Sequence, residues 1–273
     1  MQEAKTPPRV GVVGVGTIGS AFVRGVAKAK LFSRIVCSPR GEKNVNALLK
    51  ELPGLVDAAK SNQEVVDKCN LIVLAVLPSQ ALIVLEELKF RKEQEIITLV
   101  ATISTSSILK TVQPCTRVAR AVPLPGISSH GCPTIVAPKG NLTAEKTAKN
   151  IFDKIGGTVL AKDDDECAVL QAVTTLMGPF YQMQQACSEW LTSKGIDAKS
   201  GNKYISCMFG GVASDAVHAI EGQRTFQNLV AEQTPGGLNE NCIHILREKG
   251  CFEVYKKCLD ASLGRLLQRP SSG

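Results

Sequence analysis

The chain has 273 residues, of which 44% are hydrophobic and only 4% aromatic, and its formal net charge is +7. This length and apolar content are sufficient for a packed core and two domains. The positive charge is spread along the chain, and the low aromatic content does not favour a base-stacking platform, so we expect no nucleic-acid partner.

The first predicted elements are a strand at residues 9–14 and a helix at residues 18–29, joined by the motif Gly14-x-Gly16-x-x-Gly19. In such a motif the first glycine makes the turn, the second lets backbone N–H groups approach a pyrophosphate, and the third lets the helix pack closely on the strand. Phosphates bind at the helix start because unpaired N–H groups point at them. The motif predicts dinucleotide binding, against the alternative of a purely structural turn. The predicted contacts are Gly14, Gly16, Thr17, Ile18 and Gly19.

The choice of cofactor is predicted from the end of the second strand, residues 34–38, which runs into Ser38-Pro39-Arg40. Folds that prefer NAD usually place an acid here to hold the ribose 2′-hydroxyl, whereas the first acid after this strand is Glu42. A hydroxyl and a guanidinium suit a 2′-phosphate instead. Ser38 and Arg40 therefore favour NADPH, with NADH as the second choice; the alternative is that they form a solvated turn.

Short strands and amphipathic helices alternate as far as about residue 160. This alternation indicates a parallel sheet with helices on both faces. The pattern Ser61-Asn62-x-Glu64 predicts an N-terminal helix cap. The remaining predicted strands are 70–76, 95–101, 117–121, 133–137 and 157–161, and the remaining helices are 42–51, 63–69, 79–89, 104–112 and 143–154.

After the acidic run at 163–166 the strand signal disappears. The first helical stretch is strongly apolar, carries Gly178-Pro179 in its middle, and must be buried on most sides, which predicts a homodimer or a higher oligomer of dimers. The predicted fold is therefore α/β: a Rossmann-type, mostly parallel sheet domain at residues 1–163, followed by an all-α substrate and dimerisation domain at 164–273. The predicted helices of this second half are 166–193, 198–221, 225–233, 236–248 and 251–268.

The sequence shows no membrane, export or metal signal. Residues 1–8 are polar and lack the apolar stretch of a signal peptide, and the apolar run at 71–77 is too short to span a bilayer. The ten cysteines are scattered, with neither a Cys-x-x-Cys pair nor zinc-ligand spacing. We therefore expect a cytoplasmic protein that binds no metal.

Five segments along the whole chain resemble the pyrroline-5-carboxylate reductase family. The resemblance implies NAD(P)H binding on a Rossmann-type domain, reduction of a cyclic imine carboxylate to proline, and dimers whose active sites lie at the seam between subunits. It also implies that Asn62, Val76, Pro78 and Ala101 contact the cofactor. The segments are the glycine motif, Ser61-Asn62, Leu74-Ala75-Val76-Leu77-Pro78, Val118-Ala119-Arg120-Ala121-Val122-Pro123, and Gly178-Pro179-x-Tyr181 with Thr234-Pro235-Gly236-Gly237.

The chain departs from the family pattern mainly on the substrate side. Leu77 replaces a lysine, Leu124 replaces an asparagine, and Met177 replaces a serine. The hydroxyl residues that usually follow the glycine pair give way to Leu238-Asn239-Glu240. These changes keep two alternatives open: a related imine reductase with a different substrate, and a non-catalytic NADP(H)-binding sensor or scaffold protein.

Imine reduction requires little acid–base chemistry, because a protonated iminium already accepts hydride once it is oriented. The turn Thr234-Pro235-Gly236-Gly237 before a helix exposes backbone N–H groups that suit a carboxylate. Asn239 stands where the resemblance places a threonine near the imine. Glu240 beside it would repel an anionic substrate, pair with a cationic amine or donate a proton; the alternative is that it only interacts favourably with the helix dipole. The predicted catalytic residues are Asn239 and Thr234, and the predicted substrate-binding residues are Thr174, Thr175, Gly178, Gly236 and Gly237.

Overall fold

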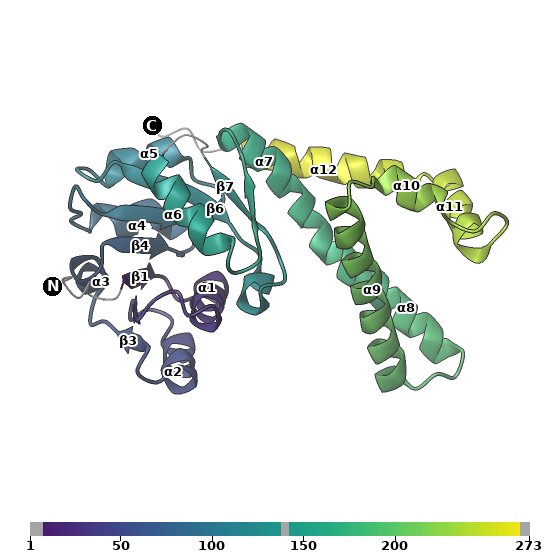
Figure 1. Ribbon diagram of the computed structural model, residues 1–273, viewed down its shortest axis with the longest axis horizontal. Coiled ribbons are helices and arrows are strands. Elements are labelled where there is room, and N and C mark those ends of the chain that lie inside the picture. The colour runs from purple at the N-terminus through teal and green to yellow at the C-terminus, as the bar shows by residue number, and fades with distance from the viewer. Residues whose placement is uncertain (1–7, 138–141, 268–273) are drawn as a thin grey trace. The chain divides into compact units, whose positions relative to one another are not determined.

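The computed structural model of the chain describes residues 8–137 and 142–267 (Figure 1). Two compact units share the chain: the first runs from its start to Gln171 and includes the end of the last helix from Arg265, and the second is Ala172–Gly264. Residues 1–7 of the expected polar segment and residue 268 of the last expected helix lie outside the described residues.

The first unit is built on an eight-stranded sheet in the order β3-β2-β1-β4-β5-β6-β7-β8. All neighbouring strands are parallel to each other except the pair β6 and β7, which is antiparallel. This arrangement confirms the predicted mostly parallel sheet. The strands are β1 Arg9–Val13, β2 Arg34–Cys37, β3 Val56–Ala58, β4 Leu71–Leu74, β5 Glu95–Thr98, β6 Arg117–Val122, β7 Thr134–Ala137 and β8 Thr158–Leu160.

Helices cover both faces of this sheet, and each face has its own apolar core. On one face Phe22 of α1 packs against Phe152 of α6, with ring centroids 6.0 Å apart. On the other face Leu85 of α4 and Ile108 of α5 belong to a second cluster. The helices are α1 Thr17–Lys28, α2 Glu42–Glu51, α3 Asn62–Lys68, α4 Pro78–Glu86, α5 Thr105–Thr111, α6 Leu142–Phe152 and α7 Asp164–Ala172, with a short 3₁₀ helix η1 at Pro125–Ser129.

The central strands are continuous apolar runs because they are buried on both faces. In β1, Val10, Val12 and Val13 are all fully buried. The sequence did not predict β3, which has three residues and only one of them, Val56, is buried. So short a strand, with a charged residue at its centre, carries no periodic apolar signal.

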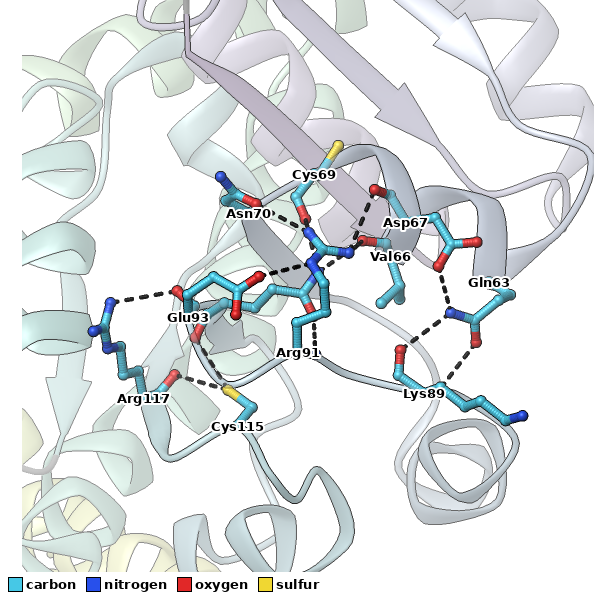
Figure 2. A network of polar contacts seen from close by, with 11 residues as sticks. Gln63, Val66, Asp67, Cys69, Asn70, Lys89, Arg91, Glu93, Cys115 and Arg117 are labelled. Carbon is cyan, nitrogen blue, oxygen red and sulfur yellow. Dashed lines mark hydrogen bonds and ion pairs between the residues drawn. The ribbon is translucent and has the colours of Figure 1, made fainter.

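A polar network closes the edge of the sheet where the strands begin (Figure 2). Arg91, in the loop before β5, donates to the carbonyl oxygens of Val66 and Cys69, each at 3.2 Å, and to the side chain of Asn70 at 3.0 Å. Its Nε donates to Glu93 at 2.9 Å. One guanidinium therefore satisfies carbonyl groups at the end of α3, where a helix leaves them unpaired, and joins that end to β4 and β5.

The second unit is helical, as the sequence predicts, but its first helix differs from the prediction. The prediction of one continuous helix at 166–193 is wrong, because the 3₁₀ helix η2, Val173–Leu176, separates α7 from α8. Pro179 therefore lies in the first turn of α8, where its missing N–H interrupts no helical hydrogen bond. The helices are α8 Met177–Ser193, α9 Ala198–Glu221, α10 Phe226–Ala231, α11 Leu238–Glu248 and α12 Cys251–Leu267, which ends in the first unit.

The helical unit leaves much of its apolar surface uncovered. None of the residues of α8 is buried within the chain, although the sequence predicts a helix buried on most sides. Trp190 of this helix is 61% exposed, and Tyr204 of α9 is 66% exposed. Among the described residues, no helix is long and apolar enough to cross a membrane.

Candidate functional site

A cavity of about 590 Å³ opens at the edge of the sheet where the strands end. It lies beside β1 and β4, which are neighbours in the sheet but continue into helices on opposite faces. Parallel sheets bind ligands at such a switch point. Of the predicted cofactor residues, only Gly19 does not line this cavity. The residues that do line it are Gly14, Gly16, Thr17, Ile18, Ser38, Arg40, Asn62, Val76, Pro78 and Ala101.

The three motif glycines meet different surroundings. Gly14 has a φ of +95°, and a Cβ added there would lie 2.7 Å from the backbone of Ala75. A Cβ on Gly19 would lie 2.1 Å from the carbonyl oxygen of Gly14, so this glycine is needed for packing of the helix on the strand. A Cβ on Gly16 would meet no atom within 4 Å. The space beside Gly16 is therefore left open for a ligand to approach the backbone.

The start of α1 supplies hydrogen-bond donors to this space. The helix is capped by the backbone of Gly16 with no side-chain cap, and its first turn holds no acid. The N–H of Ser20 bonds back to the carbonyl oxygen of Gly16 at 3.0 Å. The three preceding N–H groups, those of residues 17–19, have no carbonyl acceptor within the helix. Unpaired N–H groups and the absence of negative charge fit the pyrophosphate of a dinucleotide.

Ser38 and Arg40 lie on the same cavity but in different environments. Ser38 is fully buried, and its Oγ accepts the N–H of Gly14 at 2.8 Å. Arg40 is exposed, and within the described part of the chain its guanidinium has neither an ion pair nor a hydrogen bond. The unpaired cation fits a 2′-phosphate at this end of the cavity. The bond from Ser38 to the glycine turn was not predicted.

The other wall of the cavity comes from α3, α4 and the end of β5. Asn62 is the first residue of α3, and the predicted cap is confirmed, since Ser61 Oγ accepts the N–H of Glu64 at 3.1 Å. Pro78 begins α4, and the side chain of Leu77 before it lines the cavity while remaining 71% exposed. This wall is mostly apolar, as expected for the part of a site that holds a ring system.

The predicted substrate residues all belong to the helical unit, in two places. Thr174 lies in η2, and Gly178 lies in the first turn of α8 with no atom within 4 Å of an added Cβ. Between them, Thr175 donates its hydroxyl to the carbonyl oxygen of Ala172 at 2.7 Å and accepts the hydroxyl of Ser262 at 3.2 Å. This hydroxyl therefore has a structural partner on each side.

The second group forms the turn before α11, where the donors expected for a ligand already have acceptors. The N–H of Gly237 bonds to the carbonyl oxygen of Thr234 at 2.8 Å. The N–H of Gly236 donates to a carboxylate oxygen of Glu240 at 2.7 Å. The amide of Asn239 donates to Gln233 Oε1 at 2.9 Å. The turn does receive a carboxylate, but that carboxylate comes from the chain itself.

Two buried cysteines of the sheet unit, Cys37 at the end of β2 and Cys69 before the start of β4, are poor candidates for nucleophiles. Burial raises the pKa of the Cys37 thiol, next to Ser38, to about 12, and that of Cys69 to about 11. Both thiols are therefore protonated at neutral pH. Among the described residues, no group of three or more His, Cys, Asp or Glu side chains is arranged to hold a metal ion.

Several residues of the cavity were missed by sequence reasoning. Asn44 of α2 donates its amide to the carbonyl oxygen of Val15 at 2.8 Å. Gly41 before it has a φ of +88° and passes close to the same carbonyl group. Gly41 carries the usual sequence signal of a left-handed position, whereas nothing in the sequence singles out Asn44. Leu99 and Val100 line the cavity next to the predicted Ala101.

Comparisons with known proteins agree with this architecture. A family model described as NADP oxidoreductase, coenzyme F420-dependent, matches residues 9–102. The chain is 32% identical to pyrroline-5-carboxylate reductase 3 of Mus musculus over 270 residues, covering 95% of each chain. It is 26% identical to pyrroline-5-carboxylate reductase of Methanosarcina acetivorans over 258 residues, covering 90% of this chain and 92% of that one. A solved structure of Plasmodium falciparum pyrroline carboxylate reductase with NADP bound has a TM-score of 0.81 at 18% identity, covering 97% of this chain and 98% of that one.

Proposed function

The chain belongs to the pyrroline-5-carboxylate reductase family, and we propose that it reduces the C=N bond of pyrroline-5-carboxylate to give proline, with NADPH as the preferred hydride donor. The observation that carries the proposal is the cavity at the end of β1 and β4, where the glycine motif, Ser38 and Arg40 converge. NADH is the second cofactor in this proposal, because the pyrophosphate site does not depend on the 2′-phosphate.

On the cofactor side, each group of the chain has a defined task. The N–H groups at the start of α1 bind the pyrophosphate, and Arg40 pairs with the 2′-phosphate. The apolar wall formed by Val76, Leu77 and Ala101 excludes water from the neighbouring part of the cavity. When bound, the reduced nicotinamide supplies the hydride.

On the substrate side, the chain orients an imine that is already protonated. In this proposal the backbone of Gly236 and Gly237 binds the carboxylate, while Thr234 and Asn239 donate hydrogen bonds beside the reacting C=N. Thr174, Thr175 and Gly178 shape the rest of the pocket. The carboxylate can bind the Gly236 N–H only after Glu240 has released it, because that donor is occupied in the structure.

The position of Glu240 is also the observation that favours a second candidate, a related imine reductase acting on a different ring. A negative charge on the turn opposes the carboxylate of an anionic substrate and is compatible with a ring that lacks one, because its protonated iminium is a cation. The third candidate is a non-catalytic sensor or scaffold protein, which would bind NADPH without turning over any imine. The three candidates share the cofactor cavity and differ in the substrate.

We further propose that the chain forms a homodimer, or a higher oligomer of dimers, in the cytoplasm. The support is the uncovered apolar surface of the helical unit, to which Tyr181, Trp190 and Tyr204 contribute. Apolar patches of this kind on a single chain mark protein interfaces.

The test is NADPH and NADH oxidation by the purified protein with pyrroline-5-carboxylate and with 1-pyrroline, the same ring without the carboxylate. The proposal predicts turnover of the carboxylated ring and a lower KM for NADPH than for NADH. Turnover of 1-pyrroline alone would instead support the second candidate. Tight NADPH binding without turnover of either ring would support the third.

A further inference from the structure

The segment between β2 and α2 is hydrogen-bonded to the glycine loop at both of its ends. At one end the buried Ser38 accepts the N–H of Gly14 at 2.8 Å. At the other end Asn44, in the first turn of α2, donates its amide to the carbonyl oxygen of Val15 at 2.8 Å. The two bonds hold consecutive residues of the loop to one short segment.

Arg40 lies between these two attachment points, and the backbone next to it is also fixed. A Cβ added to Gly41 would lie 2.8 Å from the carbonyl oxygen of Val15, and Gly41 has a φ of +88°. The turn that carries Arg40 therefore packs directly against the carbonyl group that Asn44 binds. A change in the position of this turn would move the guanidinium of Arg40 relative to the loop.

A hydrogen bond from α1 also holds the glycine loop, but it binds a different carbonyl oxygen from the one that Asn44 binds. Ser20 donates its hydroxyl to the carbonyl oxygen of Gly16 at 2.7 Å. This bond lies within α1 and its cap, so it does not reach the segment that carries Arg40. The bond from Asn44 to Val15 is accordingly a cross-link between the pyrophosphate loop and the 2′-phosphate turn.

We infer that Asn44 is a positioning residue that couples recognition of the 2′-phosphate by Arg40 to binding of the pyrophosphate by the glycine loop. The inference rests on the cofactor role in the proposed function, not on the identity of the imine. The two phosphate groups of one dinucleotide contact both parts at once, so a fixed spacing between those parts lowers the entropy lost on binding. Loss of this cross-link would weaken binding of the pyrophosphate by the loop and binding of the 2′-phosphate by Arg40. It would also reduce the cooperativity between the two.

The test is a fluorescence titration of the full-length protein with NADPH and with NADH. Asn44→Ala is compared with wild type, with Arg40→Ala, and with the double variant. Asn46→Ala is the matched control, because Asn46 is an exposed asparagine on the same helix and does not line the cavity. Asn44→Leu removes the donor while keeping a similar volume, and it guards against an effect of packing alone.

We expect Asn44→Ala and Asn44→Leu to raise the Kd of both cofactors about fivefold, the loss typical of one hydrogen bond. Arg40→Ala should raise the Kd of NADPH and leave that of NADH unchanged. The decisive result is the coupling: the loss of NADPH affinity caused by Arg40→Ala should be smaller by about threefold or more when Asn44 is already replaced, as for residues in one network. A residue that only stabilises the fold would not change this ratio.

The inference is overturned if Asn44→Ala binds both cofactors as Asn46→Ala does. It is equally overturned if the effects of Arg40→Ala and Asn44→Ala on NADPH affinity simply multiply. These outcomes are distinct from failure of the proposed reaction, because the titration reads cofactor binding without any imine. A wild-type chain that bound neither cofactor would overturn the cofactor role itself and the inference with it.

Discussion

The two units of the chain differ in how much of their apolar surface one chain covers. In the sheet unit Phe22 is fully buried and Leu85 nearly so, and each face of the sheet has its own core. In the helical unit Trp190 and Tyr204 are more than half exposed. The sheet unit thus forms its core and its cavity from one chain, whereas the helical unit has an apolar surface suited to a second copy.

The same contrast holds for the predicted site residues. Those on the cofactor side, except Gly19, meet around one cavity, where the space at Gly16 is open and Arg40 has no partner among the described residues. Those on the substrate side are engaged with neighbours in the helical unit, including Glu240 on Gly236. The proposed cofactor site is therefore preorganised in a single chain, whereas the proposed substrate site has an internal contact that a ligand must break.

The largest expected effect separates folding from binding in the sheet unit. Gly19→Ala places a methyl group 2.1 Å from the carbonyl oxygen of Gly14, and we expect a loss of about 3 kcal/mol or more in the free energy of unfolding because backbone must move. Gly16→Ala meets no atom, so its melting temperature should stay near that of wild type while its NADPH affinity falls. Thermal unfolding and NADPH titration of both variants measure this. Equal stability of the two variants would contradict the assigned packing role of Gly19.

A charge introduced on the exposed apolar surface of the helical unit tests whether that surface binds a second copy of the chain. Trp190→Glu replaces an apolar side chain that is 61% exposed in the single chain with a negatively charged one. If this face binds a second copy, we expect dimer affinity to fall by about thirtyfold or more, since a buried tryptophan at an interface contributes about 2 kcal/mol or more. Light scattering across a dilution series measures the mass. A wild-type chain that is monomeric at all concentrations would contradict the proposed dimer.

A smaller effect is expected at the turn before α11. Glu240→Gln keeps an oxygen that accepts the Gly236 N–H but removes the negative charge. We expect the KM for pyrroline-5-carboxylate to fall about threefold, because a nearby exposed charge contributes about 0.5–1 kcal/mol, with no change for 1-pyrroline. Steady-state kinetics with the two rings measure this, and Glu248→Gln, on the same helix, serves as the matched control. An equal change for both rings would exclude a charge effect on the carboxylate.

The smallest effect is a pH dependence of stability in the sheet unit. The pKa of Glu64 is lowered below its ordinary value mainly by a hydrogen bond from the side chain of Lys68. A hydrogen bond from the backbone N–H of Lys60 makes the next largest contribution. A carboxyl with a lowered pKa stabilises the fold above its unfolded pKa and loses that contribution as the pH falls through its folded pKa. Glu64→Gln should therefore reduce the difference in melting temperature between neutral and acidic pH. A pH profile identical to that of wild type would exclude this contribution.

The sequence predicts the sheet unit better than it predicts the details of the helical unit, for physical reasons. Strands buried on both faces are uninterrupted apolar runs, and the glycine motif identifies the turn at Gly14 directly. The strand β3 was missed because three residues with one buried side chain form no pattern. The break at η2 was missed because an apolar stretch with Gly178-Pro179 is equally consistent with a kinked helix.

The contacts that complete the cofactor cavity show a second reason. Ser38 was predicted as a phosphate ligand from its place after β2, but its bond to Gly14 depends on the distance between two loops. Asn44 likewise has no signal of its own, because its partner Val15 lies 29 residues away in the sequence. Long-range contacts of polar side chains have no periodicity that a single sequence displays.

The most direct measurement of the central claim follows the hydride itself. NADPH carrying deuterium at the transferred position of the nicotinamide is mixed with the protein and pyrroline-5-carboxylate, and the proline formed is examined by mass spectrometry. The account predicts that the deuterium appears on the former imine carbon of proline. Consumption of neither reactant, with the labelled NADPH still bound, would contradict it.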